Sequence, residues 1–301
     1  MSKILITTTT FGTLSSEPID KLKAKGFEVV MNPYGRRITT EELRNLLPGI
    51  IGMIAGTEII DRETMKNSQL KVISRCGSGI SDIDLAAAKE LGIIVRNTPD
   101  ATTNSVAELT LGGILVLLRH ISQMDGEVHG KKWDKKMGAQ LCGKKVLIIG
   151  FGRIGKRLAK LMKPFGVEIM AVDPALSGIV DEVPIVSLEQ GLPQADIICL
   201  HPSGSEMILD RDKFNLMKQG VYLSNAARGE NWDEEALVEA LRSGRVAGAY
   251  VDVFVQEPYT GPLTEFPQMV LTPHIGSYSR ECRVQMEIDA VNNLLAEIGL
   301  L

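Results

Sequence analysis

The segment Lys144–Asp173 contains three glycines with the spacing G-x-G-x-x-G, which is typical of a turn that binds nucleotide phosphates. An apolar run precedes the glycines, a helical pattern follows them, and a second apolar run ends at Asp173. Gly150 allows a tight turn, Gly152 lets backbone N–H groups approach a pyrophosphate, and Gly155 lets the helix pack on the strand. The N-terminus of that helix favours an anion. This order of elements predicts a dinucleotide site.

Asp173 determines which dinucleotide we expect. A carboxylate about 20 residues beyond the glycines binds a ribose 2′-hydroxyl and would repel a 2′-phosphate. We therefore expect NAD, while Arg153 within the turn leaves NADP open, and a solvated acid before Pro174 is the alternative for Asp173. The cofactor contacts expected from this turn are Gly150, Gly152, Arg153, Ile154 and Gly155.

Polar residues follow several other apolar runs, and doubly wound sheets bind their ligands beyond the carboxyl ends of their strands. The first such segment is Arg75-Cys76-Gly77-Ser78-Gly79. Backbone N–H groups at Ser78 and Gly79 would suit an anionic oxygen, and Arg75 could support it. A plain connecting turn is the alternative reading of this segment.

Four acidic, basic and imidazole side chains stand at the ends of later strand-like runs. Arg228 is followed by glycine and could hold a carboxylate by two parallel hydrogen bonds, unless it is simply solvated. Asp252 and Glu257 lie at and just past one strand end, where an exposed loop carboxylate is the alternative for Glu257. His274 is one of only four histidines and is the candidate for proton transfer.

Composition excludes several classes of protein. A formal charge of −4 and a pI of about 5.7 argue against a nucleic-acid surface. The longest apolar run, Leu109–Leu118, is shorter than the ~20 residues of a membrane span, and the N-terminus lacks the pattern of a signal peptide. Scattered cysteines indicate reduced thiols in a cytoplasmic protein and no metal site. They are Cys76, Cys142, Cys199 and Cys282.

Strand-like runs alternate with helical patterns in two series, which predicts parallel sheets joined by crossover helices. The first series comprises Lys3–Thr9, Phe27–Pro33, Ile50–Gly56, Leu70–Cys76 and Ile93–Asn97. The second comprises Val146–Gly150, Val167–Asp173, Ala195–His201, Val221–Ala226, Ala247–Val253 and Met269–Thr272. Thr103–His120 predicts a long buried helix joining two domains, and Arg283–Ile298 predicts a helix that returns to the first. We expect a discontinuous substrate domain (1–100 plus 275–301) and an NAD-binding domain (101–274).

Taken in order, these segments resemble the D-isomer-specific 2-hydroxyacid dehydrogenases, and most closely the D-3-phosphoglycerate dehydrogenase-like branch. The resemblance covers nearly the whole chain. The segments that carry it are Arg75–Asp84, Asn97–Glu108, Gly150–Gly155, Asn225–Gly229, Asp252–Pro258 and Pro273–Gly276. It implies an α/β protein with two doubly wound parallel-sheet domains, a flavodoxin-like substrate domain and a Rossmann NAD-binding domain.

The resemblance also implies roles for single residues. Arg228 would bind the substrate carboxylate and polarise the reacting carbonyl, His274 would exchange a proton with the substrate oxygen, and Glu257 would hydrogen-bond the far side of the imidazole. Arg75 and the backbone around Ser78 and Gly79 would also hold the substrate carboxylate. Further cofactor contacts are expected at Ser78, Val106, His201, Ala226, Ala227, Asp252 and Gly276.

The function implied is that of an NAD-dependent D-2-hydroxyacid dehydrogenase, with 3-phosphoglycerate as the first candidate substrate. Arg36 and Arg37 could bind its phosphate, although two solvated turn arginines are an equal alternative. A glyoxylate or hydroxypyruvate reductase, a phosphite or formate dehydrogenase, and a non-catalytic NAD-sensing regulator are the other readings. We expect a cytoplasmic homodimer with no nucleic-acid, membrane or metal partner.

Two segments depart from the family pattern. Ser81-Asp82 stands where the family has Asp-Asn, and Glu230-Asn231-Trp232 stands where it has glycine and two apolar residues. The second departure puts a carboxylate and a bulky indole just past Arg228. We expect it to alter the shape of the local loop and the range of substrates.

Overall fold

The computed structural model describes residues 2–299, and the chain divides into two compact units. One unit comprises Met1–Thr102 and Ser277–Leu301, and the other comprises Thr103–Gly276. The boundaries predicted from the sequence, after residues 100 and 274, each lie two residues before the divisions between these units, which follow Thr102 and Gly276. Residues 1, 300 and 301 of the predicted substrate domain lie outside the described part of the chain.

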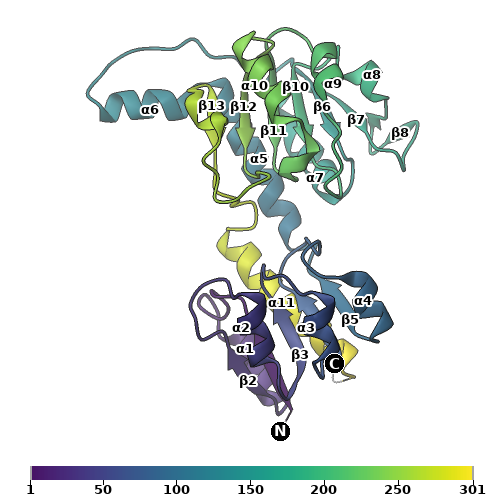
Figure 1. Ribbon diagram of the computed structural model, residues 1–301. Helices are drawn as coiled ribbons and strands as arrows, with labels where there is room; N and C mark the ends of the chain where they lie inside the picture. Colours follow the sequence, from purple (N-terminus) through teal and green to yellow (C-terminus); the bar gives the residue numbers. More distant parts are fainter. Residues whose placement is uncertain (1, 300–301) are drawn as a thin grey trace. The chain divides into compact units, whose positions relative to one another are not determined.

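The first unit is a five-stranded parallel sheet in the order β2-β1-β3-β4-β5 (Figure 1). Its strands are β1 (Lys3–Ile6), β2 (Glu28–Met31), β3 (Ile50–Ala55), β4 (Val72–Arg75) and β5 (Ile94–Asn97). Its helices are α1 (Glu17–Ala24), α2 (Thr40–Leu46), α3 (Arg62–Lys66), α4 (Leu85–Glu90) and α11 (Arg280–Glu297). This strand order is flavodoxin-like, as predicted for the substrate domain.

The alternation of side chains in β1 gives this sheet two buried faces. Ile4 and Ile6 contribute to one core and Leu5 to the other, because successive side chains in a strand point to opposite faces. α11 covers the face of Ile4 and Ile6 with Met286 and Leu294, which are fully buried there. The C-terminal helix therefore returns to the first unit, as the sequence predicts.

The second unit is a six-stranded parallel sheet in the order β13-β12-β11-β10-β6-β7. Its strands are β6 (Lys145–Ile149), β7 (Glu168–Val172), β10 (Ile197–Leu200), β11 (Val221–Asn225), β12 (Val246–Val251) and β13 (Met269–Leu271). Ile185 makes an isolated parallel bridge to Ala171 of β7, at the outer edge. With that bridge counted as a reduced third strand, the order is that of a Rossmann fold, with β13 added. The predicted fold class is confirmed.

Helices and short elements connect these strands. The helices are α5 (Thr102–Leu118), α6 (Ile121–His129), α7 (Arg153–Met162), α8 (Leu188–Gly191), α9 (Arg211–Leu216) and α10 (Glu234–Arg242). The 3-10 turns are η1 (Lys163–Phe165), η2 (Gly229–Asn231) and η3 (Pro262–Glu265), and β8 (Ile179–Val180) pairs with β9 (Val183–Pro184). Six predicted strands of the second series correspond to the six strands of this sheet.

The predicted helix Thr103–His120 is shorter than expected and is buried on one face only. α5 ends at Leu118, and His120 adopts a left-handed backbone conformation (φ 51°) that turns the chain into α6. α6 buries none of its residues and extends away from the sheet of the second unit (Figure 1). None of the described helices alone meets the length and hydropathy of a membrane span; only the bent pair α5 and α6 does so together.

Candidate active site

The three glycines of the second unit form a turn in which each has a different steric environment. Gly150 has a positive φ (91°), and a Cβ atom there would lie 2.3 Å from the carbonyl oxygen of His201. A Cβ atom on Gly155 would lie 2.2 Å from the carbonyl oxygen of Gly150. A Cβ atom on Gly152, which precedes α7, would meet no atom within 4 Å. The turn is therefore closed at its two ends and open at its middle glycine, as the approach of a pyrophosphate requires.

Asp173 follows β7 and faces the same turn. Its Oδ2 accepts a hydrogen bond from the N–H of Phe151 at 2.9 Å, and its Oδ1 accepts one from the N–H of Ala175 at 3.0 Å. Each carboxylate oxygen retains a second lone pair for another donor. The carboxylate therefore braces the glycine turn and can still accept a ribose hydroxyl. Arg153 and Ile154 form the first turn of α7 beside it.

His201 lies directly after β10 and beside the glycine turn. Its N–H donates to the carbonyl of Ile149 at 2.7 Å, and the residue is only 8% exposed. Neither ring nitrogen has a hydrogen-bond partner among the described residues. Burial lowers the pKa of His201 to about 4, so the ring is neutral at physiological pH. Burying ring nitrogens without hydrogen-bond partners lowers the stability of the folded protein. These nitrogens lie where β10 and β6 are neighbours, which is the position where ligands bind in this fold.

Within the second unit, three of the expected cofactor contacts converge. A Cβ atom on Gly276 would lie 3.2 Å from Cγ2 of Val106 and 3.2 Å from Oδ2 of Asp252. Ala226 and Ala227 follow β11, and Ala227 is buried. Ser78, the remaining expected contact, belongs to the first unit. The second unit thus presents a glycine turn, an acid that can accept a ribose hydroxyl and a small-residue lining, which fit a dinucleotide.

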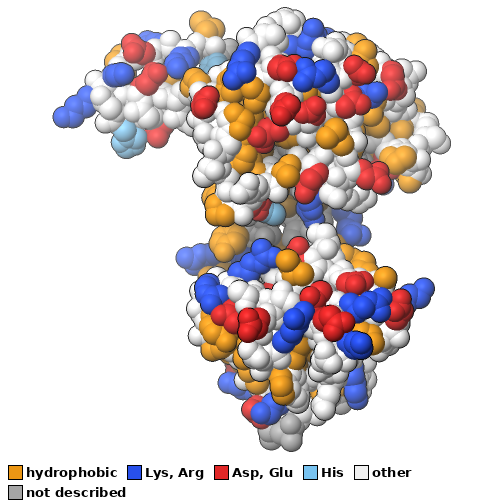
Figure 2. Space-filling model, in the orientation of Figure 1, with side chains coloured by type: hydrophobic (Ala, Val, Ile, Leu, Met, Phe, Trp, Pro, Cys, Tyr) orange, Lys and Arg blue, Asp and Glu red, His pale blue; other side chains and the backbone are white. Residues whose placement is uncertain are grey.

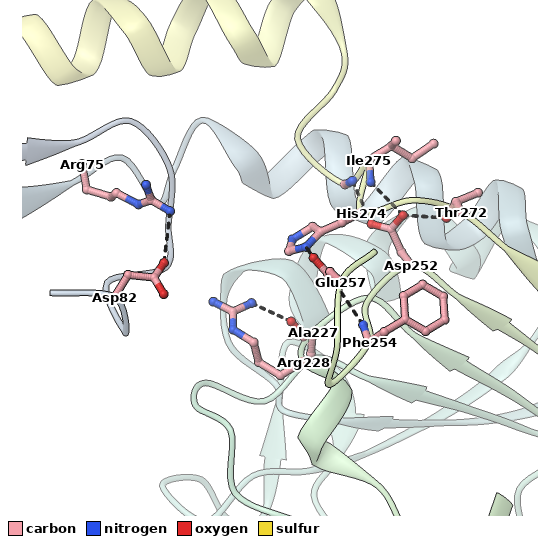
Figure 3. Close-up of polar contacts among 11 residues, drawn as sticks. Arg75, Asp82, Ala227, Arg228, Asp252, Phe254, Glu257, Thr272, His274 and Ile275 are labelled. Atoms are coloured by element: carbon pink, nitrogen blue, oxygen red, sulfur yellow. Dashed lines mark hydrogen bonds and ion pairs between the residues drawn. The ribbon is translucent and has the colours of Figure 1, made fainter. Parts of the chain in front are cut away.

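His274 and Glu257 form a hydrogen-bonded pair in the second unit (Figure 3). Nδ1 of His274 lies 2.8 Å from Oε2 and 3.1 Å from Oε1 of Glu257. Oε1 also accepts the N–H of Phe254 at 3.1 Å, which orients the carboxylate. Since a carboxylate only accepts, Nδ1 carries the proton of this bond. Nε2 makes no hydrogen bond with any described residue, so it is available to exchange a proton.

The turn that carries Arg228 packs directly against the segment that carries Glu257. A Cβ atom on Gly229 would lie 2.2 Å from backbone atoms of Phe254 and Val255, so only glycine fits there. Asn225, which is fully buried, donates from Nδ2 to the carbonyl of Arg228 at 2.8 Å. Nη1 of Arg228 donates to the carbonyl of Ala227 at 2.6 Å, and the side chain is half-buried. The guanidinium keeps most of its donors for an anion.

The indole just past Arg228 lies in the core of the second unit. Trp232 is 3% exposed and lies in the hydrophobic core of the second unit, bridged to Leu209. Asn231 instead donates from Nδ2 to the carbonyls of Gly204 and Glu206, at 3.1 and 2.9 Å. The departure from the family pattern therefore ties the Arg228 turn to the loop after β10.

In the first unit, Arg75 and the turn after β4 form a separate group of hydrogen-bond donors. Nε of Arg75 donates to the carbonyl of Gly79 at 3.0 Å, and Nη2 lies 3.8 Å from Oδ2 of Asp82 (Figure 3). Gly77 has a φ of +148°, and its N–H donates to Oγ1 of Thr98 at 2.9 Å. The N–H groups of Ser78 and Gly79 donate to no described residue. Burial lowers the pKa of Arg75, while the charges of Glu58 and Asp82 oppose that shift.

Arg36 is engaged in an ion pair. Nη2 and Nη1 of Arg36 lie 2.6 and 2.9 Å from the two carboxylate oxygens of Glu42. This pairing lowers the pKa of Glu42 to about 2. Glu42 also closes a capping box with Thr39 at the start of α2, so its position is fixed by the helix. Arg37 remains exposed, and the two arginines therefore do not form an open pair for a phosphate.

Sequence reasoning overlooked several residues that support the site. Their side chains make hydrogen bonds to partners far away in the chain, which no local pattern indicates. They are Asn231, Tyr250 and Thr272. Among the described residues, no group of three or more His, Cys, Asp or Glu side chains could hold a metal ion.

Known proteins resemble the chain along nearly its full length. Residues 111–276 match the family described as D-isomer specific 2-hydroxyacid dehydrogenase, NAD binding domain. The chain is 36% identical to the hydroxypyruvate reductase of Thermotoga maritima, over 95% of this chain and 97% of that protein. It is also 36% identical to the D-3-phosphoglycerate dehydrogenase of Archaeoglobus fulgidus over 91% of this chain, but spans only 54% of that protein. A crystal structure from Thermus thermophilus aligns with a TM-score of 0.90 at 35% identity, covering 99% of this chain and 97% of that one.

Proposed function

This chain belongs to the D-isomer specific 2-hydroxyacid dehydrogenase family and uses NAD, and from that premise we propose which residues perform the reaction. We propose that the protein interconverts a small D-2-hydroxy acid and its 2-oxo acid through His274, Glu257 and Arg228. The observation that carries this proposal is the 2.8 Å contact between Nδ1 of His274 and Oε2 of Glu257, which leaves Nε2 unpaired among the described residues.

His274 handles the proton in both directions. The nicotinamide, when bound, would supply the hydride as NADH in reduction or accept it as NAD+ in oxidation. In reduction, protonated His274 donates from Nε2 to the carbonyl oxygen of the substrate. In oxidation, the neutral ring accepts the hydroxyl proton at the same atom. Glu257 holds the ring by Nδ1–H and stabilises its charged form.

The substrate carboxylate is held by guanidinium and backbone donors. Arg228 binds it with two parallel hydrogen bonds, a geometry that lysine cannot provide. The guanidinium of Arg75 and the unpaired N–H groups of Ser78 and Gly79 bind it as well. Both assignments follow from the family resemblance and from the anion-binding geometry of each segment taken by itself.

The cofactor is held by the second unit, with Ser78 as an additional contact. The glycine turn and the start of α7 bind the pyrophosphate. Asp173 accepts the ribose hydroxyl, and His201 borders the cofactor site with its unpaired ring nitrogens. The assigned contacts are Ser78, Val106, Gly150, Gly152, Arg153, Ile154, Gly155, Asp173, His201, Ala226, Ala227, Asp252 and Gly276.

Two substrates stand out. The resemblance favours 3-phosphoglycerate, whose phosphate Arg37 would bind. The occupied fork of Arg36 favours an unphosphorylated acid such as hydroxypyruvate, because a phosphate would have to displace Glu42. A panel of 2-oxo acids and their 2-hydroxy partners, with NAD(H) and NADP(H) in parallel, tests both. Absorbance of the reduced nicotinamide reports turnover, and turnover of none of the panel would refute the proposal.

We propose that the protein is a homodimer, with α6 and the segment after it at the interface. The apolar side chains there are unusually exposed, and Figure 2 shows hydrophobic and charged side chains mixed along this projection. Val128, Trp133 and Met137 are 54%, 80% and 94% exposed. Burying such a patch against a second copy is the common solution for two-fold dimers. Light scattering should give twice the 32.8 kDa of one chain, and a single-chain mass would refute the dimer.

We also infer a cytoplasmic location. Cys76, Cys142 and Cys199 are free thiols, as in proteins of a reducing compartment. Denatured protein isolated without reductant should titrate four thiols. Fewer thiols, recovered only after reduction, would contradict the inference.

A further inference from the structure

His274 has an unusual backbone conformation for a residue with a side chain. Its φ is +53°, in the left-handed region that mainly glycine and asparagine adopt. Such a conformation persists only where the surrounding contacts hold it. The contacts that hold this turn therefore also determine where Nε2 of His274 points.

Asp252 is the residue that holds the turn. It is 1% exposed, and its two carboxylate oxygens accept three hydrogen bonds (Figure 3). Oδ1 accepts from Oγ1 of Thr272 at 2.6 Å and from the N–H of Ile275 at 2.8 Å. Oδ2 accepts from the N–H of Gly276 at 2.8 Å. These donors lie on both sides of His274, so the carboxylate fixes the chain before and after the imidazole.

The hydrogen bonds of Asp252 extend through Thr272 to Tyr250, and the direction of each bond can be assigned. An ionised carboxylate has no proton, so Thr272 must donate its only hydroxyl proton to Asp252. Oγ1 of Thr272 also lies 3.0 Å from the hydroxyl of Tyr250, and it must therefore accept from Tyr250. The order of donation is Tyr250 to Thr272 to Asp252.

The position of the Tyr250 ring is fixed by packing. The residue is fully buried in β12, and α5 carries Gly113 opposite the ring. A Cβ atom on Gly113 would lie 2.4 Å from the ring, so any side chain there would displace it. Packing thus fixes the position of the Tyr250 hydroxyl, which is the first donor in this series of hydrogen bonds.

We propose that Thr272 is a positioning residue of the reaction, which with the support of Tyr250 orients Asp252 and through it the turn that carries His274. This inference rests on the proposed function, because it assigns His274 the proton transfer. Thr272 touches neither substrate nor the reacting atoms. It acts through Asp252, and a hydroxyl at this position is what the role requires.

The charge of Asp252 gives this role a measurable signature. Burial raises the pKa of Asp252, while the hydrogen bond from Thr272 and the charge of His274 lower it. The titratable side chains acting on Asp252 are His274, beyond β13, and Tyr250 of β12. Without the hydroxyl, Asp252 protonates at higher pH, and a protonated oxygen no longer holds the amide donors. The acid limb of the kcat profile then moves to higher pH.

The variants Thr272→Val, Thr272→Ser and Tyr250→Phe separate the hydroxyl from the shape of the side chain. Thr272→Val should lower kcat by about 10- to 100-fold, which is the effect of losing a hydrogen bond to a charged group. The KM for the 2-oxo acid should stay nearly unchanged. Thr272→Ser should restore kcat to within about threefold of the wild type, and Tyr250→Phe should lower it only about threefold. Thr64→Val, which removes a buried hydroxyl bonded to Arg44 in the first unit, is the matched control and should leave kcat unchanged.

Amide hydrogen exchange provides a readout that needs no turnover. In Thr272→Val, the amides of Ile275 and Gly276 should exchange about tenfold faster or more, while those of β6 stay protected. Equal kcat in Thr272→Val and the wild type, or equal loss in Thr272→Val and Thr272→Ser, would overturn the inference. Unchanged exchange of both amides would also overturn it. Wild-type protein that turns over no 2-oxo or 2-hydroxy acid would instead refute the proposed function, and the exchange result would then still report whether Thr272 holds the turn.

Discussion

Nδ1 of His274 lies 2.8 Å from Oε2 of Glu257, although η3 and β13 separate the two residues in the sequence. The same carboxylate is fixed by the N–H of Phe254, whose backbone in turn closes over Gly229 next to Arg228. The side chains of Arg228, Glu257 and His274 thus share one support. This arrangement engages Nδ1 of the imidazole and leaves Nε2 without a hydrogen-bond partner among the described residues.

Replacing Glu257 with glutamine removes the charge while keeping a hydrogen-bond acceptor for Nδ1–H. We expect kcat to fall about 10- to 100-fold, because the charged imidazole loses its stabilising partner, while NADH affinity stays unchanged. Steady-state kinetics and nicotinamide fluorescence titration measure the two quantities. Glu265→Gln, an exposed carboxylate of η3, is the control, and equal kcat in both variants would remove Glu257 from the mechanism.

Alanine substitutions at two glycines of the turn should have different effects, one on the stability of the fold and the other on NAD binding. Gly155→Ala should lower the free energy of unfolding by more than about 2 kcal/mol, because its methyl group would lie 2.2 Å from a carbonyl oxygen. Gly152→Ala should cost less than about 1 kcal/mol, since its methyl group meets no atom within 4 Å. Its NAD dissociation constant should instead rise about 10- to 100-fold, because the methyl group blocks the pyrophosphate. Denaturant unfolding and calorimetric titration distinguish the two. NAD affinity that survives in Gly152→Ala would place the pyrophosphate elsewhere.

His201 makes the free energy of unfolding depend on pH. The folded protein holds the pKa of His201 at about 4, whereas the unfolded chain binds the proton near pH 6.5. Between these values the unfolded state binds more protons, so stability falls as the pH drops, by up to roughly 3 kcal/mol. Unfolding free energies measured from pH 7 to 4 should decline less steeply in His201→Gln. His129→Gln, an exposed histidine, should keep the wild-type slope, and parallel slopes in all three proteins would contradict the buried neutral ring.

Asp173 should control the choice of cofactor. Asp173→Ala removes the acceptor for a ribose hydroxyl and the repulsion of a 2′-phosphate. We expect KM for NADH to rise about tenfold and the ratio of kcat/KM for NADPH to NADH to rise by at least as much. The substitution also removes the acceptor for the N–H of Phe151. Loss of this bond loosens the glycine turn and contributes to the higher KM for NADH. A ratio that does not move would mean that another residue selects the cofactor.

The sequence predicts the framework well because local patterns carry it. Strand-like apolar runs such as Ile50–Gly56 and Val167–Asp173 coincide with β3 and β7, and the glycine spacing gives the turn before α7. It does not predict α6, because the break at His120 depends on a positive φ in a residue that is not glycine. The helix after it has exposed apolar residues and no buried face to produce a periodic signal.

Contacts between distant residues are the part that no local pattern reveals. Trp232 lies in the core and is bridged to Leu209, and the sequence, which places the indole just past Arg228, does not reveal this packing. Arg36 stands six residues before Glu42, and only the fold shows that the capping box presents that carboxylate to it. Thr272 next to Pro273 gives no hint of its bond to Asp252.

The most direct test of the account compares the wild type with His274→Ala in one absorbance assay of NADH oxidation, using hydroxypyruvate and the 2-oxo acid of 3-phosphoglycerate. The wild type should oxidise NADH with at least one of the two. His274→Ala should bind NADH with nearly unchanged affinity and lose turnover by at least about 1000-fold, because the proton donor is gone. Turnover that persists in His274→Ala, or a wild type that binds NADH and reduces neither acid, would contradict the proton transfer assigned to His274.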